Sequence, residues 1–194
     1  MIGELLNIVA KEVSKYIDAQ VKLPARKKSV VLHKPKSDNG KLDIPDNTIS
    51  FSLLNIEEEL SKRSAIVQKQ VIDGKVYKQD PAVHINLQVI FIANFSNDYI
   101  NELNYITKVI EFFQQKPSFT SQNTKGLAKL GIDKLSFKLN TLPLDEQHNI
   151  WSLVGSGKYM PSIIYKIGVI NIQNEQQLSD LSIVKDVDLK VDKR

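Results

Sequence analysis

The sequence predicts an α+β fold, in which a single mixed or antiparallel sheet is packed by an N-terminal helix and one long helix. Two segments place apolar residues at helical spacing, residues 2–20 and 98–115. Four segments have the alternating or two-sided apolar pattern of strands, residues 48–60, 83–95, 135–140 and 160–172. Because strands and helices are mixed without regular βαβ alternation, α+β is the best class.

The first part of the chain begins with an amphipathic helix over residues 2–20, and Pro24 lies just past its expected end. Residues 22–47 are punctuated by three prolines and are expected to be a loop with a short strand around 29–33. Further on, Asp73-Gly74 lies between apolar β-forming residues, which predicts a type I′ hairpin.

Residues 83–95 form the most strongly predicted strand. One face is apolar throughout, and the other turns apolar at Ile90 and Ile92, as in a central strand. Ser96 or Asn97 is expected to cap the long helix that follows. The predicted apolar stripe of that helix consists of Tyr99, Leu103, Ile106, Val109, Ile110 and Phe113.

The remaining elements are shorter. Residues 118–133 are polar and contain glycines, which predicts a loop. Asp145 is expected to cap a short helix that ends near Leu153. Trp151, the sole tryptophan, either anchors this short helix against the sheet or lies in an interface, where tryptophan is enriched.

We expect a globular domain of residues 1–174, followed by a polar C-terminal tail or arm of residues 175–194. Ile183, Val187 and Leu189 are spaced along this tail. The tail could therefore add a strand to the sheet edge of a neighbouring subunit. The alternative is a tail that is only partly ordered.

The composition is that of an ordinary globular protein, with 42% hydrophobic and 25% charged residues, which excludes collagen and a wholly disordered chain. Cysteine is absent, which excludes disulfides, a thiolate nucleophile and Cys-ligated metal. The formal net charge of +4 is too mild to imply nucleic-acid binding. Neither a secretory signal nor a membrane span is apparent, so we expect the protein to fold in the cytoplasm.

Basic residues are concentrated between residues 22 and 41, where Arg26, Lys27 and Lys28 are adjacent. A basic patch of this kind could dock on an acidic protein surface. The alternative is a solvated loop. Nucleic-acid binding would need interleaved aromatic residues, and this segment has none.

No sequence pattern indicates an enzyme, a metal site or a cofactor. The GSGK segment at 155–158 lacks the spacing and the flanking elements of a phosphate-binding loop. His33, His84 and His148 have no second histidine at metal-binding spacing, and the chain contains no G-x-S-x-G motif. An enzyme of unrecognised type therefore has no positive support.

Several stretches resemble a known family in the same order along the chain. One is the strand–turn–helix unit from Phe91 to Tyr99. Another runs from Leu142 or Leu144 to Trp151 and ends in Y-x-P-S-x-x-Y, Tyr159 to Tyr165. Over about residues 1–172 the sequence resembles the Pvc16 N-terminal domain family. The hairpin at 71–77 and the loop at 118–133 look like local insertions.

The resemblance implies a fold like that of phage tail terminators and a structural role, with no catalytic residues to carry over. Such proteins are caps of contractile injection systems, and they are typically hexameric rings at the distal end of the inner tube. The implied partners are further copies of the chain and the tube and sheath proteins of the same machine. Neither nucleic acid nor direct membrane insertion is implied. The assembled particle is either released or associated with the cell.

The least core-like segments are the expected contact regions of such a subunit. From the basic loop we select Arg26, Lys27 and Lys28, and near the short helix Trp151 and Tyr159. From the tail we select the three spaced apolar residues named above. The alternative function is a non-ring adaptor that links the machine to an effector or a membrane-side partner.

Overall fold

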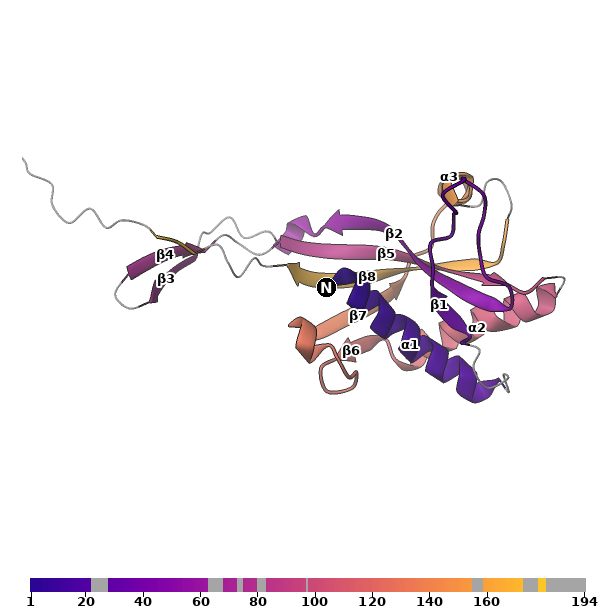
Figure 1. Cartoon of the computed structure of the whole chain (residues 1–194), viewed down its shortest axis with the longest axis horizontal. Helices are drawn as coiled ribbons and strands as arrows, with labels where there is room; N and C mark the ends of the chain where they lie inside the picture. The colour runs from indigo at the N-terminus through magenta and orange to yellow at the C-terminus, as the bar shows by residue number, and fades with distance from the viewer. Residues whose placement is uncertain are drawn as a thin grey trace, which may run out of the picture. The chain divides into compact units, whose positions relative to one another are not determined.

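A six-stranded mixed sheet organises the larger of two units of the chain (Figure 1). The computed structural model describes residues 1–21, 28–62, 68–72, 75–79, 83–96, 98–154, 159–172 and 178–180. The first unit comprises Met1–Glu57 and Ile85–Ile170, and the second comprises Glu58–His84 and Asn171–Arg194.

The strands of the large sheet lie in an order that differs from their order in the sequence. Across the sheet they are β1 (Val30–Leu32), β2 (Thr48–Glu58), β5 (Val83–Asn94), β8 (Ser162–Ile172), β7 (Lys134–Leu139) and β6 (Ser118–Thr120). Strand β1 runs parallel to β2, whereas β6 and β8 run antiparallel to β7. The sheet is therefore mixed, and the predicted α+β class is confirmed.

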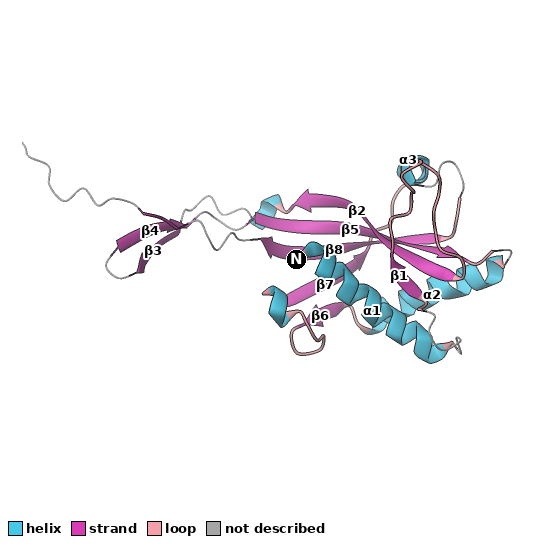
Figure 2. Ribbon diagram, viewed as in Figure 1, coloured by secondary structure: helices cyan, strands magenta, loops and turns pink. Residues whose placement is uncertain are grey.

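Three helices cover the two faces of this sheet (Figure 2). Helices α1 (Ile2–Gln20) and α2 (Tyr99–Gln115) pack on one face, and α3 (Leu144–Val154) packs on the other. Helix α1 has the predicted bounds, because its apolar residues recur at helical spacing over the whole segment. None of the described helices is long and apolar enough to cross a membrane.

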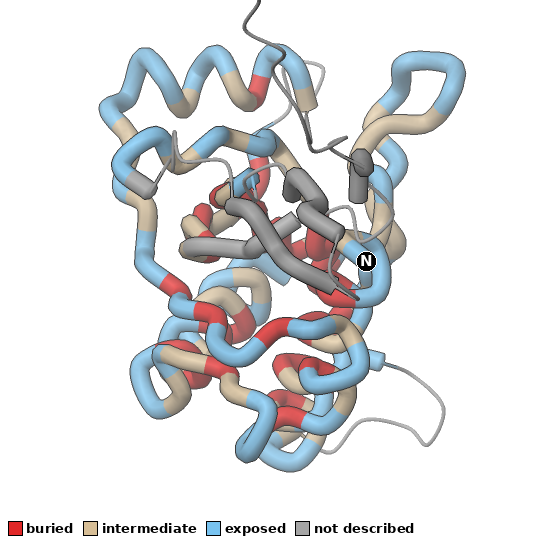
Figure 3. Tube along the Cα trace, turned by 90° about the vertical axis from the view of Figure 1, so that its left-hand side faces the viewer, coloured by how far each residue is buried: buried red, intermediate tan, exposed pale blue. Residues whose placement is uncertain are grey.

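The main core lies between the sheet and the pair α1 and α2. The ring of Phe91 on β5 stacks on Phe51 of β2 at 4.5 Å between centroids, and Phe113 of α2 lies against Tyr165 of β8 at 4.5 Å. All four of these aromatic residues are buried. Figure 3 shows the buried positions gathered in the interior of the unit. Aromatic pairs of this geometry add about 1 kcal/mol each beyond the burial of their area.

A second, smaller core lies on the opposite face of the sheet, beneath α3. Ile90 and Ile92 of β5 contribute to it, together with Trp151, Met160 and Ile164. The sequence-based expectation that the far half of this strand is apolar on both faces is thus confirmed. A central strand needs this pattern because packed side chains cover both of its faces.

Three local expectations are corrected by the structure. The cap of α2 is Asp98, whose carboxylate accepts a hydrogen bond from the Asn101 N–H at 3.1 Å, rather than Ser96 or Asn97. Helix α3 begins at Leu144, one residue before the expected cap Asp145. The predicted loop at 118–133 contains β6 and the short 3-10 helix η2 (Ala128–Leu130).

The second unit contains a three-stranded antiparallel sheet in the order β3 (Gln68–Ile72), β4 (Lys75–Gln79) and β9 (Leu178–Asp180), preceded by the short 3-10 helix η1 (Leu60–Lys62). The pairing of Ile72 with Lys75 leaves two residues between β3 and β4, as the hairpin prediction requires. The turn residues themselves lie outside the described residues. Strand β9 belongs to the segment that the sequence assigns to a tail, and it pairs with β4 of the same chain. The boundary at residue 174 stays a prediction.

Candidate interaction site

Helix α3 carries apolar side chains that point away from the core. We call Leu144, Leu153 and Tyr159, together with the adjacent Trp151, the α3 patch. The first three residues are 84%, 73% and 67% exposed, whereas Trp151 is only 8% exposed. An isolated exposed leucine needs no explanation, but a group of large exposed apolar residues around one helix is a candidate contact surface.

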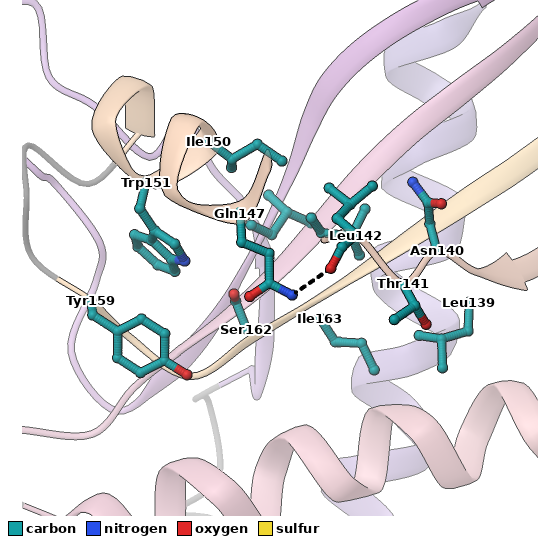
Figure 4. Close-up of a pocket in the computed structure, with 12 residues that line it drawn as sticks. Leu139, Asn140, Thr141, Leu142, Gln147, Ile150, Trp151, Tyr159, Ser162 and Ile163 are labelled. Atoms are coloured by element: carbon teal, nitrogen blue, oxygen red, sulfur yellow. Dashed lines mark hydrogen bonds between the residues drawn. The ribbon is translucent and has the colours of Figure 1, made fainter. Parts of the chain in front are cut away.

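One buried residue and a few hydrogen bonds hold α3 against the sheet. Trp151 is the only buried residue of the helix, and it packs on Ile90 and Ile92. The Gln147 side-chain amide donates to the Leu142 carbonyl at 3.2 Å (Figure 4). At the far end, Lys36 Nζ donates to the Leu153 carbonyl at 3.2 Å, and so satisfies one of the free carbonyls of the last turn.

A cavity of about 330 Å³ opens beside this helix. It is lined by Leu144, Gln147, His148, Trp151, Ser152 and Tyr159. The rings of Trp151 and Tyr159, which both line this cavity, lie 5.7 Å apart at a tilt of 56°. Figure 4 shows the two rings in a close-up of an adjacent pocket that they also line. The walls of the first cavity are mostly apolar, without a cluster of ionisable groups. Such a hollow suits an inserted side chain of a partner protein better than catalysis.

Helix α2 carries a second exposed apolar surface, which we call the α2 stripe. Its members are Tyr99, Ile100, Leu103 and Ile110, all of them exposed. The sequence analysis placed three of these residues in the core-facing stripe, and this placement was wrong. The residues of α2 that are buried are Tyr105, Val109, Phe112 and Phe113. The spacing of Ile100, Leu103 and Ile110 is itself helical, so a search for a second stripe would have found this surface.

Lysines gather beside α1, where a shallow groove of about 450 Å³ is lined by Lys11, Ser14, Lys15, Asp18, Ala19 and Lys28. We call it the α1 groove. Asp18 is occupied by its own neighbours, because its carboxylate accepts hydrogen bonds from Ser14 Oγ and from Ser29 N and Oγ. Within the part of the chain that the structure describes, the three lysines have no carboxylate partner. The groove is therefore open to an acidic group from outside.

The other residues selected from the sequence are distributed as follows. Lys28 lines the α1 groove, while Arg26 and Lys27 lie outside the described residues. Ile183, Val187 and Leu189 also lie outside the described residues, as does the GSGK segment at 155–158. Trp151 and Tyr159 are brought together in the α3 patch. The structure thus places Trp151 beside Tyr159 and places Lys11 and Lys15 beside Lys28, while the role of these residues in contacts stays a prediction.

Titratable groups do not form a reaction centre in the described part of the chain. No group of three or more His, Asp or Glu residues there could hold a metal ion. Burial in the main core raises the pKa of Tyr165 to about 12. The hydrogen bond and the charge of Lys34, whose Nζ lies 2.6 Å from Asp38 Oδ1, lower the pKa of that exposed carboxyl. Packing and a local ion pair explain both shifts.

The larger unit is thus an α+β fold whose sheet is covered by helices on both faces and whose helices expose apolar side chains. The sequence profile of the family described as "Pvc16 N-terminal domain" matches residues 4–185. The chain therefore belongs to the Pvc16 N-terminal domain family, as the sequence motifs indicated. A comparison with curated protein sequences finds no match.

Two solved structures have a similar fold. The first is the tube terminating cap of the anti-feeding prophage, with a TM-score of 0.56, 15% identity, and coverage of 98% of this chain and 62% of that one. The second is the sheath/tube terminator, in the extended state, of an extracellular contractile injection system, PVC. Its TM-score is 0.50 at 16% identity, with coverage of 95% of this chain and 63% of that one. The chain thus spans less than two thirds of the length of either relative.

Proposed function

We propose that this chain is a structural cap, or tail terminator, subunit of a phage-tail-like contractile injection system. In this role several copies form a ring, expected to be hexameric, that ends the inner tube and anchors the distal end of the sheath. The observation that carries the proposal is the fold: 98% of the chain aligns with an anti-feeding prophage tube terminating cap. The match of residues 4–185 to the Pvc16 N-terminal domain supports it.

The surfaces of the large unit suit such a role. A closed ring of identical subunits that meet head to tail needs two different surfaces on each subunit. The α3 patch lies on one face of the large sheet, and the α2 stripe and the α1 groove lie on the other. A ring contact uses two of these surfaces and leaves a third for the tube or the sheath. This role requires no cofactor and no catalytic group.

The proposal also covers the place of assembly and the role of the C-terminal segment. We expect assembly in the cytoplasm, followed by incorporation into a particle that is either released or kept at the cell. We also expect residues 175–194 to act as an arm, in which Ile183, Val187 and Leu189 add a strand to the sheet edge of a neighbour. The domain of residues 1–174 would form the body of the ring.

Light scattering behind a sizing column tests the proposal on the purified chain, alone and with the tube protein of its machine. The expected mass is near six times 22.0 kDa for the chain alone. Where the ring forms only on tube protein, the mass should equal six copies of the chain plus the bound tube protein. End-on electron microscopy should then show a ring. A chain that stays monomeric or dimeric under both conditions contradicts the cap. That result supports the alternative, a non-ring adaptor, for which the free lysines of the α1 groove offer a docking surface.

A further inference from the structure

We propose that the α3 patch of one copy docks in the α1 groove of the next copy. This inference rests on the proposed function, because it names the two surfaces that meet in the ring. It is drawn from the charges and the apolar contacts of the described residues. The occupant of the groove is therefore a second copy of this chain.

Two acids lie next to the α3 patch, at the start of its helix. Leu144 is followed directly by Asp145 and Glu146 in the first turn of the helix, and both acids are exposed. Neither acid has a cationic partner among the residues that the structure describes. The last turn of α3 contains no basic residue. A surface that binds this part of α3 should therefore carry positive charge for the two acids and apolar atoms for Leu144.

The α1 groove provides both features. Lys11, Lys15 and Lys28 are exposed and lack a carboxylate partner in the described regions. Ala19 also lines the groove, and long lysine side chains in general can cover apolar groups with their aliphatic stems while their ammonium groups stay in solvent. Asp18, the acid of the groove, is already bonded to Ser14 and Ser29. The net local charge is positive, opposite to that of the first turn of α3.

The α2 stripe is a poorer seat for α3, although it is more apolar. Helix α2 carries Glu102, Glu111 and one lysine, Lys108, so its net charge has the same sign as Asp145 and Glu146. The Lys108 ammonium already donates to Gln20. Bringing like charges together across an interface costs several kcal/mol. Charge complementarity therefore selects the α1 groove. The α2 stripe thus remains available to bind a protein surface other than the α3 patch.

The positions of the two surfaces fit a head-to-tail contact. Helix α1 packs on one face of the large sheet and α3 on the other (Figure 1). A contact between α3 of one copy and α1 of the next thus uses different surfaces on each subunit. Repetition of such a contact closes into a ring if the rotation between neighbours allows it.

Charge exchange tests the contact in the full chain. We expect Lys11→Glu with Lys15→Glu to weaken ring formation roughly 100-fold, because it sets acids against acids. Asp145→Lys with Glu146→Lys should have a similar effect. The variant that carries all four substitutions should recover most of the ring, because the two charges have exchanged sides. Light scattering over a dilution series, with tube protein wherever the wild type requires it, measures each variant.

Lys129→Glu with Lys134→Glu is the matched control. Both lysines are exposed and lack a carboxylate partner in the described part of the chain, and neither lines the α1 groove or the α3 patch. The control changes the net charge by the same amount and should leave the ring intact. Circular dichroism and thermal unfolding of the lysine variants and of the control should match the wild type, since these residues are exposed. Asp145→Lys with Glu146→Lys replaces acids in the first turn of α3, so this variant should unfold slightly more easily while its circular dichroism shows that it folds.

Three outcomes contradict this contact. If the wild type forms the ring and the Lys11 and Lys15 variant does so equally well, the contact is wrong and the cap function stands. If both charge reversals abolish the ring but their combination does not restore it, the two surfaces do not meet each other. If the wild type forms no ring with or without tube protein, the cap function fails and this contact fails with it.

Discussion

Helices α1 and α3 have similar amphipathic sequences but serve the molecule in different ways. Helix α1 has 19 residues and buries seven of them, Leu5, Leu6, Val9, Ala10, Val13, Ser14 and Ile17. Helix α3 has 11 residues and buries only Trp151. Its Ile150 and Val154 are partly buried against the smaller core, whereas Leu144 and Leu153 are mostly exposed. An apolar pattern on a helix therefore predicts that its apolar face will pack against other residues. It does not show whether those residues belong to the same chain or to a partner.

The physical difference lies in what surrounds each helix. Helix α1 contacts β1 and α2, and it is tied to α2 by an ion pair between Lys116 and Glu12 at 2.8 Å. Helix α3 lies over the smaller core, with an open cavity beside it. Full burial of a large aliphatic side chain stabilises a fold by about 2 kcal/mol. Hence α1, with its seven buried residues, contributes more to the stability of the unit than α3, which adds only Trp151 and the partly buried Ile150 and Val154.

The largest expected effect comes from the α1 side. Leu5→Ala should lower the free energy of unfolding by about 3 kcal/mol, because Leu5 is fully buried and its loss leaves a cavity in the main core. Urea unfolding followed by circular dichroism measures this change. Leu153→Ala is the matched control in α3 and should change stability by no more than about 0.5 kcal/mol. Equal losses in the two variants would remove the contrast between the helices.

A smaller effect is expected for the anchor of α3. Trp151→Ala should cost about 2 kcal/mol, below the roughly 3–5 kcal/mol typical of Trp→Ala in a closed core, because Trp151 borders an open cavity. The loss should be local, so hydrogen exchange of α3 should accelerate more than that of α1. Equal acceleration in both helices would mean that α3 is an integral part of the main core.

The pH dependence of stability tests the burial of Tyr165 in β8, with Tyr159, which precedes this strand, for comparison. Burial raises the pKa of Tyr165 to about 12 from the ordinary 10.0, so the unfolded chain loses this proton first. The stability that this shift represents is present below pH 10 and is lost as the pH rises from about 10 to about 12. Tyr165→Phe should reduce this loss in urea unfolding at alkaline pH. Tyr159→Phe, at an exposed position, serves as the control and should retain it.

The smallest effect on stability is expected at the exposed part of the α3 patch. Leu144→Ser with Leu153→Ser should change the free energy of unfolding by less than about 0.5 kcal/mol, because both side chains are mostly in solvent. The same variant should weaken ring formation, as measured by light scattering with tube protein. A variant that unfolds more easily but still forms the ring would show that these leucines belong to the core.

Much of the fold could be predicted from local patterns. The bounds of α1, the central position of β5 and the hairpin strands β3 and β4 all agree with the sequence analysis. These elements are long or have distinctive turn residues, so the periodicity of their own residues determines them. Strand β6 escaped prediction because three residues are too few to display an alternation, although Phe119 within it is fully buried. Its formation depends on pairing with β7.

The surfaces required the tertiary structure. The sequence could select Trp151, Tyr159 and Lys28, because aromatic and basic residues stand out in a polar segment. It could not show that Lys11 and Lys15 share a groove with Lys28, because Lys28 lies 13 positions after Lys15 in the sequence. Nor could it distinguish the inner stripe of α2 from the outer one, because both stripes repeat at helical spacing. Periodicity along the chain determines the elements, while the choice of which face is buried depends on packing between distant segments.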